Sequence, residues 1–438
     1  MPILAQRARG TSGTSGARAT PGRRRAGSLS RPGGGARATM RVVHVLVAPD
    51  CFGSSLTSAQ AAAAIAEAWR ETCPHDDVRV CPLSDGGPGF VQTLQATLGG
   101  ELVAVSVDGP LGVPAPAALL VVDHPVTGRT AYVESAHAVG LALVPDDRRD
   151  PTRTTSRGLG TLLAAARATG ARRVVVGLGG SGTNDAGAGL LVGLGLPDER
   201  GVLATGGGAL VDVRPDDLAG LAALRADWRE VELLVATDVD VPLLGLQGAS
   251  AGFAPQKGAT PEQAQSLERA LATFSRIAVD ALGDALRPDL LAAPGPARSA
   301  ATRLTHAPGA GAAGGLGFGL SLLGGRLVPG AALVADAVGL DARIAAADLV
   351  VTGEGRFDWQ SLHGKVASLV AERAMPHAVP AIVVAGQVEI GRREISAAGL
   401  AGAYAVAERP DEVSLALADP VGTLAARARR VARTWSPA

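Results

Sequence analysis

The stretch VVVGLGGSGTNDAGAG, residues 174–189, carries the strongest fold signal in this chain. Its three valines predict a short buried strand, and the glycine-rich loop that follows leads into a helix. Glycine lets the backbone approach an anion closely, and the start of the helix adds N–H donors and a positive dipole end. We therefore interpret the loop as a phosphate or carboxylate cradle, with Thr183, Asn184 and Asp185 as its polar side chains.

The same loop also matches a dinucleotide-binding fingerprint. Gly177, Gly179 and Gly182 have the spacing G-x-G-x-x-G. That fingerprint needs an acid about 20 residues further on, at the end of the next strand. Here the acids Asp198 and Glu199 lie in a turn before a glycine-rich stretch. An oxidoreductase is therefore the less favoured interpretation.

Outward from this stretch, apolar strand-like runs alternate with Ala-rich helical runs. Strands are expected at residues 42–48, 77–82, 117–123, 130–134, 174–176, 233–236, 349–351 and 380–385, and long helices at 58–72 and 261–284. Such alternation predicts an α/β fold with mainly parallel strands. The runs at 117–123 and 130–134 flank a turn and are expected to form a hairpin.

Acidic residues recur where the apolar runs end, each beside glycine or proline: Asp50, Asp85, Asp185, Asp238 and Glu354. In open α/β sheets the carboxyl ends of the strands form the ligand crevice. Acids in that position can hold Mg²⁺ or act as bases, whereas any single one could simply cap a helix. Five together favour a functional site.

Two rare residue types mark further loops. The chain has 39 Arg but only two Lys, Lys257 and Lys365, and one Asn, Asn184. Arg and Lys are not interchangeable at packed sites. The two lysines and the single asparagine are therefore candidates for positions where the chemistry requires that residue type. Lys365 ends the run TGEGRFDWQSLHGK, residues 352–365, which also holds Arg356 and Asp358. Mixed acids and cations beside glycine turns suit phosphoryl transfer.

The bulk composition excludes several classes of protein. The 438 residues are 47% hydrophobic and 19% charged, which is enough for a large core. No uninterrupted run of 18 apolar residues suggests a membrane span. The sequence lacks the G-x-x-x-x-G-K-[ST] and G-x-S-x-G motifs and any zinc-type cysteine spacing. Three sparse cysteines favour a reducing, cytoplasmic location.

Charge divides the chain into two unlike parts. Residues 1–39 carry eight Arg and no acid, in a Gly/Ser/Pro-rich arm that we expect to be disordered. The rest holds 33 basic against 41 acidic residues. This acidic body argues against nucleic acid as a partner.

Motifs spread along residues 41–430 resemble the bacterial type I glycerate kinase (glycerate 2-kinase) family. They are APDCFGSSLTS, PLSDGGPGF, DGPLG (108–112), TAYVESAHAVGL (130–141), DPTRTTSRGLG (150–160), GLGGSGTNDAGAG (177–189), ATDVDVPLLG (236–245), GASAGFAPQKGA (248–259), PGAGAAGGLGFGL (308–320) and TGEGRFDWQSLHGK. They occur in the order and spacing of the family, which makes the resemblance far more specific than any single glycine loop.

The resemblance implies two α/β domains. A Rossmann-like parallel-sheet domain would be formed by both chain ends, residues 40–105 and 300–435, with a second α/β domain inserted at 106–299. It also implies the ATP- and Mg²⁺-dependent phosphorylation of D-glycerate, at the 2-hydroxyl, by a cytoplasmic enzyme. A homodimer is compatible with this interpretation.

The resemblance also assigns site residues. It implies catalytic roles for Asp50, Asp185, Lys257 and Lys365, with Asp50 or Asp185 as the acid near the hydroxyl. Substrate or phosphate contacts would come from Asp85, Gly86, Gly87, Gly179, Gly180, Ser181, Thr183, Asn184, Arg356 and Asp358. Asp238 and Glu354 are the metal-side candidates.

Two loops depart from the family pattern. The usual Ser and Lys of the first loop are replaced by Cys51 and Gly53, and the usual Glu-Gly-Thr of the second is Pro88-Gly89-Phe90. The loss of polar groups leaves two alternatives open beside a glycerate kinase. One is a kinase of a related small hydroxy acid, and the other is a non-catalytic, ligand-binding homologue.

Overall fold

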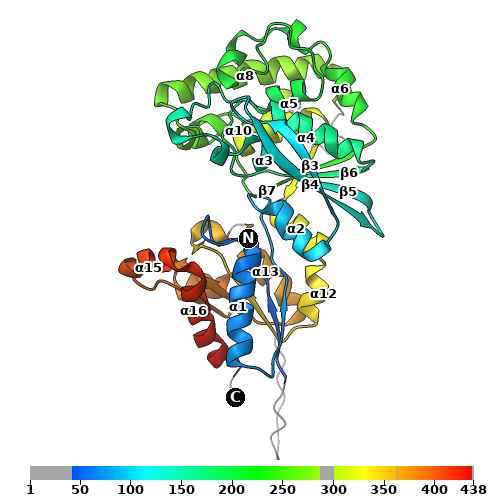
Figure 1. Cartoon of the computed structure of the whole chain (residues 1–438). Helices are drawn as coiled ribbons and strands as arrows, with labels where there is room; N and C mark the ends of the chain where they lie inside the picture. Colours follow the sequence, from blue (N-terminus) through cyan, green and yellow to red (C-terminus); the bar gives the residue numbers. More distant parts are fainter. Residues whose placement is uncertain (1–41, 287–299, 363, 437–438) are drawn as a thin grey trace, which may run out of the picture. The chain divides into compact units, whose positions relative to one another are not determined.

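A computed structural model describes residues 42–286, 300–362 and 364–436 (Figure 1). The arm predicted at 1–39 lies outside the described residues. Two β-sheets organise the rest, and the α/β fold class predicted from the sequence is confirmed.

The first sheet is five-stranded, parallel throughout, and has the order β13-β11-β9-β1-β2. Its strands come from two distant parts of the chain: β1 (His44–Val47), β2 (Asp77–Val80), β9 (Leu349–Thr352), β11 (Ala381–Ala385) and β13 (Gly402–Ala405). A short parallel pair, β10 (Arg356–Phe357) and β12 (Gln387–Val388), follows β9 and β11.

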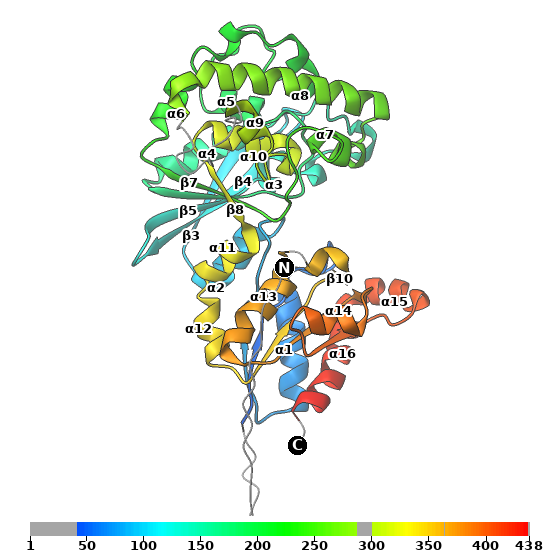
Figure 2. The same cartoon turned by 180° about the vertical axis from the view of Figure 1, so that it is seen from behind.

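Helices cover both faces of this sheet because its strands are apolar on both sides. Val45 and Val47 pack in one core with α1 (Ser58–Thr72) and α16 (Pro420–Trp435). Leu46 faces a second core with α11 (Gly330–Ala337), α12 (Leu340–Ala345), α13 (Val366–Ala374) and α14 (Arg392–Ala397) (Figure 2). The short α15 (Val413–Ala418) precedes α16 and has no buried residue.

Helix α1 shows how the local sequence sets an element boundary. Thr57 caps it: the Thr57 hydroxyl accepts from the Gln60 N–H at 3.2 Å, and the Gln60 side chain accepts from the Thr57 N–H at 2.9 Å. This capping box satisfies two donors that a helix start leaves free. The helix predicted at 58–72 is therefore confirmed at both ends.

The second sheet is six-stranded, with the order β3-β4-β5-β6-β7-β8. Strands β3, β4 and β5 form an antiparallel meander that contains the predicted hairpin. Strand β5 also begins a parallel set that continues through β6, β7 and β8. The strands are β3 (Glu101–Asp108), β4 (Pro114–His124), β5 (Gly128–Glu134), β6 (Arg173–Gly177), β7 (Glu232–Thr237) and β8 (Arg326–Pro329).

One face of this sheet packs in a large core with most of the central helices. They are α3 (Ala136–Val139), α4 (Arg157–Ala168), α5 (Ala188–Gly193), α6 (Leu221–Asp227), α7 (Ala249–Phe253), α8 (Pro261–Leu282), α9 (Ala300–Thr305) and α10 (Ala312–Leu322). On the other face Leu120, Val175 and Leu234 join α2 (Phe90–Leu98) and α11. This second core is continuous with that of the five-stranded sheet.

The strand membership bears on the predicted domain boundaries. The five-stranded sheet uses residues 44–80 and 349–405, and the six-stranded sheet uses residues 101–329. Strands β3 and β8, neither of them expected from the sequence, thus lie across or beyond the proposed limits at 105/106 and 299/300. The division into two domains stays a prediction.

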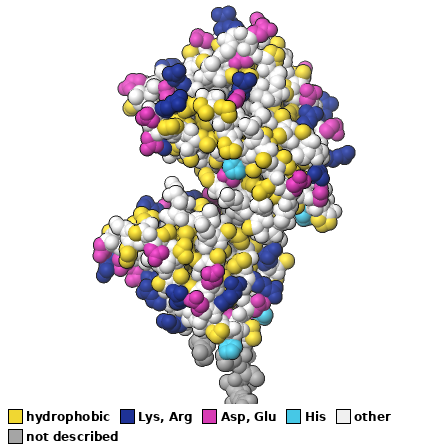
Figure 3. Space-filling model, in the orientation of Figure 1, with side chains coloured by type: hydrophobic (Ala, Val, Ile, Leu, Met, Phe, Trp, Pro, Cys, Tyr) yellow, Lys and Arg dark blue, Asp and Glu magenta, His cyan; other side chains and the backbone are white. Residues whose placement is uncertain are grey.

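Two surface properties complete the description. Among the described residues, no helix combines the length and apolarity that a bilayer crossing requires. Lys and Arg side chains are interspersed with Asp and Glu over the face drawn in Figure 3.

Candidate active site

Four acids lie close together in the loops that follow strands. Asp50 comes shortly after β1, Asp85 lies in the loop after β2, Asp238 directly follows β7 and Glu354 comes shortly after β9. The charge of Asp85 acts on each of the other three carboxyl groups. We call these four residues the acid cluster, and the predicted convergence of strand-end acids is found for them.

Burial and mutual repulsion make the charged forms of three acid-cluster carboxyl groups unfavourable and so raise their pKa values. Burial, and next the charge of Asp85, raise the pKa of Asp50 well above its usual range. The same two causes raise the pKa of Asp238 to about 7. Burial also raises the pKa of Glu354 to about 7, although the charge of Lys365 acts in the opposite direction. The cluster therefore holds more negative charge than its neighbours neutralise.

Two oxygens of the cluster are buried without a donor. Asp238 Oδ1 accepts from the N–H groups of Gly330 at 2.7 Å and Ala331 at 3.2 Å, at the start of α11. Asp238 Oδ2 and Glu354 Oε1 have no hydrogen-bond partner among the described residues. Buried acceptors of this kind are costly unless a ligand satisfies them.

These two oxygens fit a hard divalent cation. Mg²⁺ prefers oxygen ligands and commonly takes only one or two protein carboxylates, leaving its other positions to water and substrate phosphates. Within the described ranges, no group of three or more ligand-type side chains is arranged to hold a metal alone. Each of the two carboxylates could therefore contribute one oxygen ligand to such a cation.

Lys257 provides positive charge beside the glycine loop. It lies in a single 3-10 turn, Pro255–Lys257, and is only 3% exposed. Its Nζ donates to Ser181 Oγ at 2.9 Å and to the Thr183 carbonyl at 2.7 Å. Burial lowers the pKa of Lys257 to about 7, against the favourable charge of Asp185. An anion bound here would restore the charged form of the ammonium group.

Asp185 is satisfied by the chain itself. Its Oδ2 accepts from the N–H and the hydroxyl of Ser156, both at 2.8 Å, and from the Gly189 N–H at 3.3 Å. Its Oδ1 accepts from the Gly187 N–H at 3.1 Å. The residue is fully buried, and burial raises its pKa while these hydrogen bonds lower it. The Asp185 carboxylate therefore organises the loop and has no exposed surface for a substrate.

Thr183 and Asn184 are also fully buried behind the loop. Asn184 Nδ2 donates to Ser250 Oγ at 3.0 Å, which ties the loop to α7. Asn184 Oδ1 and Thr183 Oγ1 are buried without a partner among the described residues. We call Ser181, Thr183, Asn184, Asp185 and Lys257 the glycine-loop site.

One pocket of about 1140 Å³ is lined by Asp85 and Asp238 of the acid cluster and by Ser181 and Lys257 of the glycine-loop site. Its lining includes seven of the residues predicted from the sequence: Asp85, Gly87, Gly179, Gly180, Ser181, Asp238 and Lys257. Gly86 is buried and does not line the pocket. Cys51 lines the same pocket, and burial, followed by Asp50 and Asp85, raises the pKa of its thiol to about 12.

Glycines make the close contacts of this pocket possible. A Cβ on Gly179 would lie 2.6 Å from Gly87 Cα, and one on Gly177 would lie 2.5 Å from the Gly86 carbonyl oxygen. A side chain at either position would force the two loops apart. The loops at 84–88 and 177–180 are therefore in direct backbone contact, which brings the acid cluster beside the glycine loop.

Sequence analysis missed a backbone feature that also lines the pocket. Ala313, Gly314 and Gly315 have successive positive φ angles of 53°, 75° and 89°. Neither the Ala313 nor the Gly314 N–H donates a hydrogen bond to another described residue. Consecutive N–H groups in such a conformation form an anion-binding concavity. The run PGAGAAGG showed a glycine-rich entry, but the left-handed alanine at its centre cannot be predicted from composition.

The remaining predicted residues lie around Glu354 and do not line the pocket. Lys365 acts electrostatically on both Glu354 and Asp238. Asp358 Oδ1 accepts from the Gln360 N–H at 2.8 Å and so starts a 3-10 turn. Arg356 is exposed and pairs with Glu389 at 3.5 Å.

The two departing loops have different local settings. Gly53 is exposed, with a φ of +58°, and a Cβ there would meet nothing within 4 Å. The loop at 88–90 leads into α2, whose first N–H groups are already occupied. Glu134 accepts from the Gly89 N–H at 3.0 Å and from the Val91 N–H at 3.2 Å. This helix start is therefore not available for a phosphate.

Comparison with known proteins gives a consistent result. The sequence profile described as "Glycerate kinase family" matches residues 45–436. A glycerate kinase of Bacillus subtilis (strain 168) is 41% identical over 348 residues, covering 78% of this chain and 85% of that protein. A glycerate 2-kinase of Escherichia coli (strain K12) is 38% identical over 348 residues, with the same coverage.

A solved structure agrees with these relatives. The crystal structure of a protein assigned as glycerate kinase 2 from Salmonella typhimurium LT2 is 36% identical in sequence and superimposes with a TM-score of 0.70. The match covers 90% of this chain and 98% of that one.

Proposed function

Because this chain belongs to the glycerate kinase family, we propose that it transfers the terminal phosphoryl group of ATP to the 2-hydroxyl of D-glycerate, giving 2-phosphoglycerate and ADP. The observation that supports this most directly is the shared pocket, which Asp238 of the acid cluster and Lys257 of the glycine-loop site both line. One region suits the cation that accompanies a nucleotide, and the other suits the carboxylate of a small acid.

The glycine-loop site is the proposed anchor for the glycerate carboxylate. Lys257 already uses two of its three N–H donors on Ser181 and Thr183, and the third remains for a ligand. The free N–H groups of Ala313 and Gly314 line the same pocket. An anion held there would receive charge-assisted hydrogen bonds, which are about twice as strong as neutral ones.

Asp50 is the proposed base, because the other acid considered for that role, Asp185, is saturated by four donors. The pKa of Asp50 is raised, first by burial and then by the charge of Asp85, which makes its carboxylate a stronger base. The glycerate hydroxyl would lose its proton to Asp50 as its oxygen bonds to phosphorus. The bond to the ADP oxygen would break in the same step.

Asp238 and Glu354 are the proposed holders of Mg²⁺, through the oxygens that lack donors. The ion would neutralise the phosphate oxygens of the nucleotide. Lys365, which acts on both acids, is the proposed cation on the phosphate side.

The test is a coupled ADP-release assay on the full chain, with ATP, MgCl₂ and D-glycerate. We expect turnover that needs all three, and phosphorus NMR of the product should show coupling to the single proton on C2. Coupling to the two protons on C3 would place the phosphate on the other hydroxyl.

The same assay separates the alternatives. Turnover with another small hydroxy acid, and none with D-glycerate, would favour a shifted acceptor. No turnover across such a panel by folded protein would contradict the proposal and favour a ligand-binding homologue. Asp50→Asn should abolish turnover, whereas the control Asp147→Asn, at an exposed position, should not change it.

A further inference from the structure

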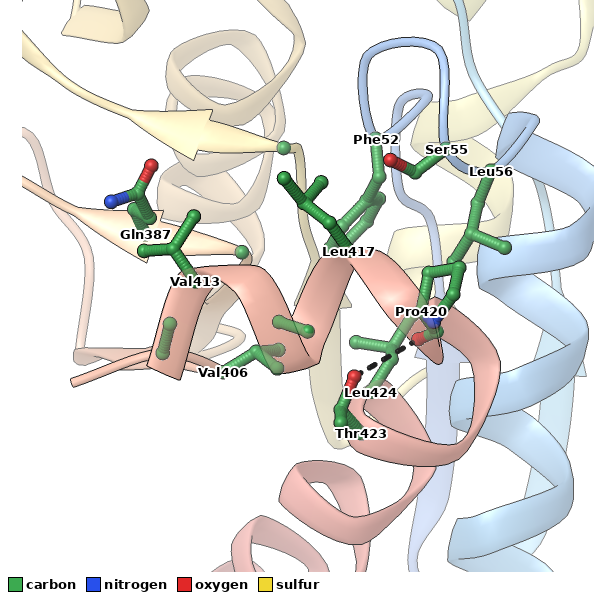
Figure 4. Close-up of a pocket in the computed structure, with 14 residues that line it drawn as sticks. Phe52, Ser55, Leu56, Gln387, Val406, Val413, Leu417, Pro420, Thr423 and Leu424 are labelled. Atoms are coloured by element: carbon green, nitrogen blue, oxygen red, sulfur yellow. Dashed lines mark hydrogen bonds between the residues drawn. The ribbon is translucent and has the colours of Figure 1, made fainter. Parts of the chain in front are cut away.

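A second pocket, of about 460 Å³, is lined by Phe52, Ser55 and Leu56 of the loop that carries Asp50. It is formed by the loop after β1, the residues that follow β9, β11 and β13, and helices α15 and α16 (Figure 4). These are the carboxyl ends of parallel strands, where open α/β sheets bind ligands. No residue with a role in the proposed phosphoryl transfer lines this pocket.

The lining of this second pocket indicates the kind of group that it would hold. Phe52, Leu56 and Leu424 supply buried apolar surface. No charged side chain lines it, and the polar side chains are those of Ser55, Gln387 and Thr423. A phosphate or a carboxylate would find no counter-charge here. A neutral ring with a polar edge matches this mainly apolar lining.

Leu417 of α15 differs from the other large apolar residues named above because it is mostly exposed to solvent. It lines the pocket and extends toward Phe52 (Figure 4), yet it is 63% exposed. Leu415 of the same helix is equally exposed at 64% but does not line the pocket, so only Leu417 could contact a ligand bound there. An aromatic ring between Leu417 and Phe52 would remove apolar surface of both from water.

Of the three polar side chains of the pocket, Thr423 donates to the Asp419 carbonyl at 2.6 Å, whereas Ser55 and Gln387 are largely unused. Among the described residues, the Ser55 hydroxyl makes no hydrogen bond. Within the described part of the chain, the Gln387 carboxamide has a single long contact, from Arg356 Nη2 to its Oε1 at 3.5 Å. A carboxamide offers a donor and an acceptor side by side, the pattern that pairs with the amino group and ring nitrogen of adenine.

The second pocket is connected to the acid cluster through adjacent residues. Phe52 lines it, Cys51 lines the larger pocket and Asp50 belongs to the acid cluster. Gly355 lines it as well, next to Glu354. A ligand seated in the second pocket would therefore lie beside the loops that carry Asp50 and Glu354.

We infer that this pocket binds the purine base of the phosphoryl donor, with Leu417 and Phe52 on its faces and Gln387 at its polar edge. The inference rests on the proposed function, since it takes ATP as the donor. It adds a base-binding subsite that neither the acid cluster nor the glycine-loop site contains.

A pair of leucines in α15 provides the test. Leu417 lines the pocket, whereas Leu415 is 64% exposed on the same helix and does not line it. Both are solvent-exposed, so neither truncation to alanine should unfold the protein. We expect Leu417→Ala to raise KM for ATP about five- to twentyfold, through lost apolar contact with the ring. KM for D-glycerate should be unchanged, and Leu415→Ala should change neither constant.

Binding measured without turnover keeps this inference separate from the proposed function. Calorimetry with ADP on the full chain should show the same loss of affinity in Leu417→Ala, and with inorganic triphosphate no difference between variants. Gln387→Ala should weaken ADP binding several-fold relative to GDP binding. ADP binding that depends on Leu417, without glycerate turnover, would support the subsite while contradicting the function. Glycerate turnover with unchanged KM for ATP in both variants would overturn the subsite alone.

Discussion

The acid cluster and the glycine-loop site are both buried and charged, but their charges are satisfied in opposite ways. Asp185 of the glycine-loop site receives four hydrogen bonds, and Lys257 donates two. In the acid cluster, Asp238 Oδ2 and Glu354 Oε1 are buried with no donor among the described residues. The protein supplies hydrogen-bond partners for the charged groups of the glycine-loop site, but in the described part of the chain it leaves two carboxylate oxygens of the acid cluster without one.

This difference separates charges that hold the fold from charges that wait for a ligand. Removing the Asp185 carboxylate would leave four buried donors without their acceptor, so its removal should cost stability. The carboxylates of the acid cluster repel one another, and two of their buried oxygens lack donors among the described residues, so they lower the stability of the folded protein. Such destabilising groups are typical of functional sites, where a bound ligand can neutralise them. Neutralising a residue should therefore move stability in opposite directions in the two regions.

The largest effect is expected for Glu354→Gln in the acid cluster. Loss of this metal-side carboxylate should lower kcat/KM about a hundred- to a thousandfold. The melting temperature without Mg²⁺ should stay the same or rise, because one buried negative charge near Asp85 is removed. Steady-state kinetics and thermal unfolding would check both effects.

The matched control for Glu354→Gln is Glu389→Gln, which removes an exposed carboxylate that pairs with Arg356. It should change neither property appreciably. A melting temperature for Glu354→Gln that falls by several degrees while activity is kept would break the comparison, since the acid cluster would then support the fold.

Asp185→Asn should show the opposite pattern. The new amide would place N–H donors against N–H groups that now meet a carboxylate. We expect the free energy of unfolding to fall by about 2–4 kcal/mol, as for a broken buried charge network. Urea unfolding followed by tryptophan fluorescence would measure the loss. An unchanged unfolding midpoint would show that the four donors are satisfied in another way.

Much of the fold could be predicted from the sequence because its main elements have strong local signals. Helix α1 has an Ala-rich run and a capping box, and the central strands are short valine- and leucine-rich runs. Strand β3 was missed because it is a largely exposed edge strand. Strand β8 was missed because it is four residues long and ends in Pro329, so its local signal is weak.

The candidate site was only partly predictable for a different reason. The pattern of a strand followed by an acid located the acid cluster. The same pattern occurs at Asp185 and at Asp238, so it cannot tell a carboxylate that the protein satisfies from one that it does not. The donors that distinguish them come from elsewhere in the chain: Ser156 for Asp185, and the start of α11 at Gly330 for Asp238. Satisfaction of a buried charge is a long-range property, which a local motif does not contain.

The pH dependence of substrate binding should be smaller than either substitution effect. The pKa of Lys257 is lowered to about 7 by burial, and a bound carboxylate would favour its charged form. Affinity for D-glycerate should therefore fall as pH rises above 7, about fivefold between pH 7 and pH 8. Calorimetry from pH 6 to 9 would measure it, and an affinity that is flat over this range would contradict carboxylate binding at Lys257.

The same pKa shift has a consequence for stability. Because the folded pKa of Lys257 lies below its unfolded value of 10.5, the unfolded chain binds more protons between these two values. The Lys257 contribution to the free energy of unfolding should therefore increase as pH rises from 7 toward 10.5, and be constant below 7. Lys257→Met should remove this slope.

The smallest effect is expected at Gly53, next to the acid cluster, where the family resemblance implies a lysine. The position is exposed and a side chain would meet nothing within 4 Å, but its φ of +58° is unfavourable for any residue with a Cβ. Gly53→Ala measures that strain alone, at about 1 kcal/mol of stability. Gly53→Lys adds a positive charge near Glu354, so its KM for ATP should be two- to threefold lower than that of Gly53→Ala. If the lysine variant binds ATP no better than the alanine variant, then the charge of the acid cluster is not neutralised from this loop, and Lys365 alone would carry that role.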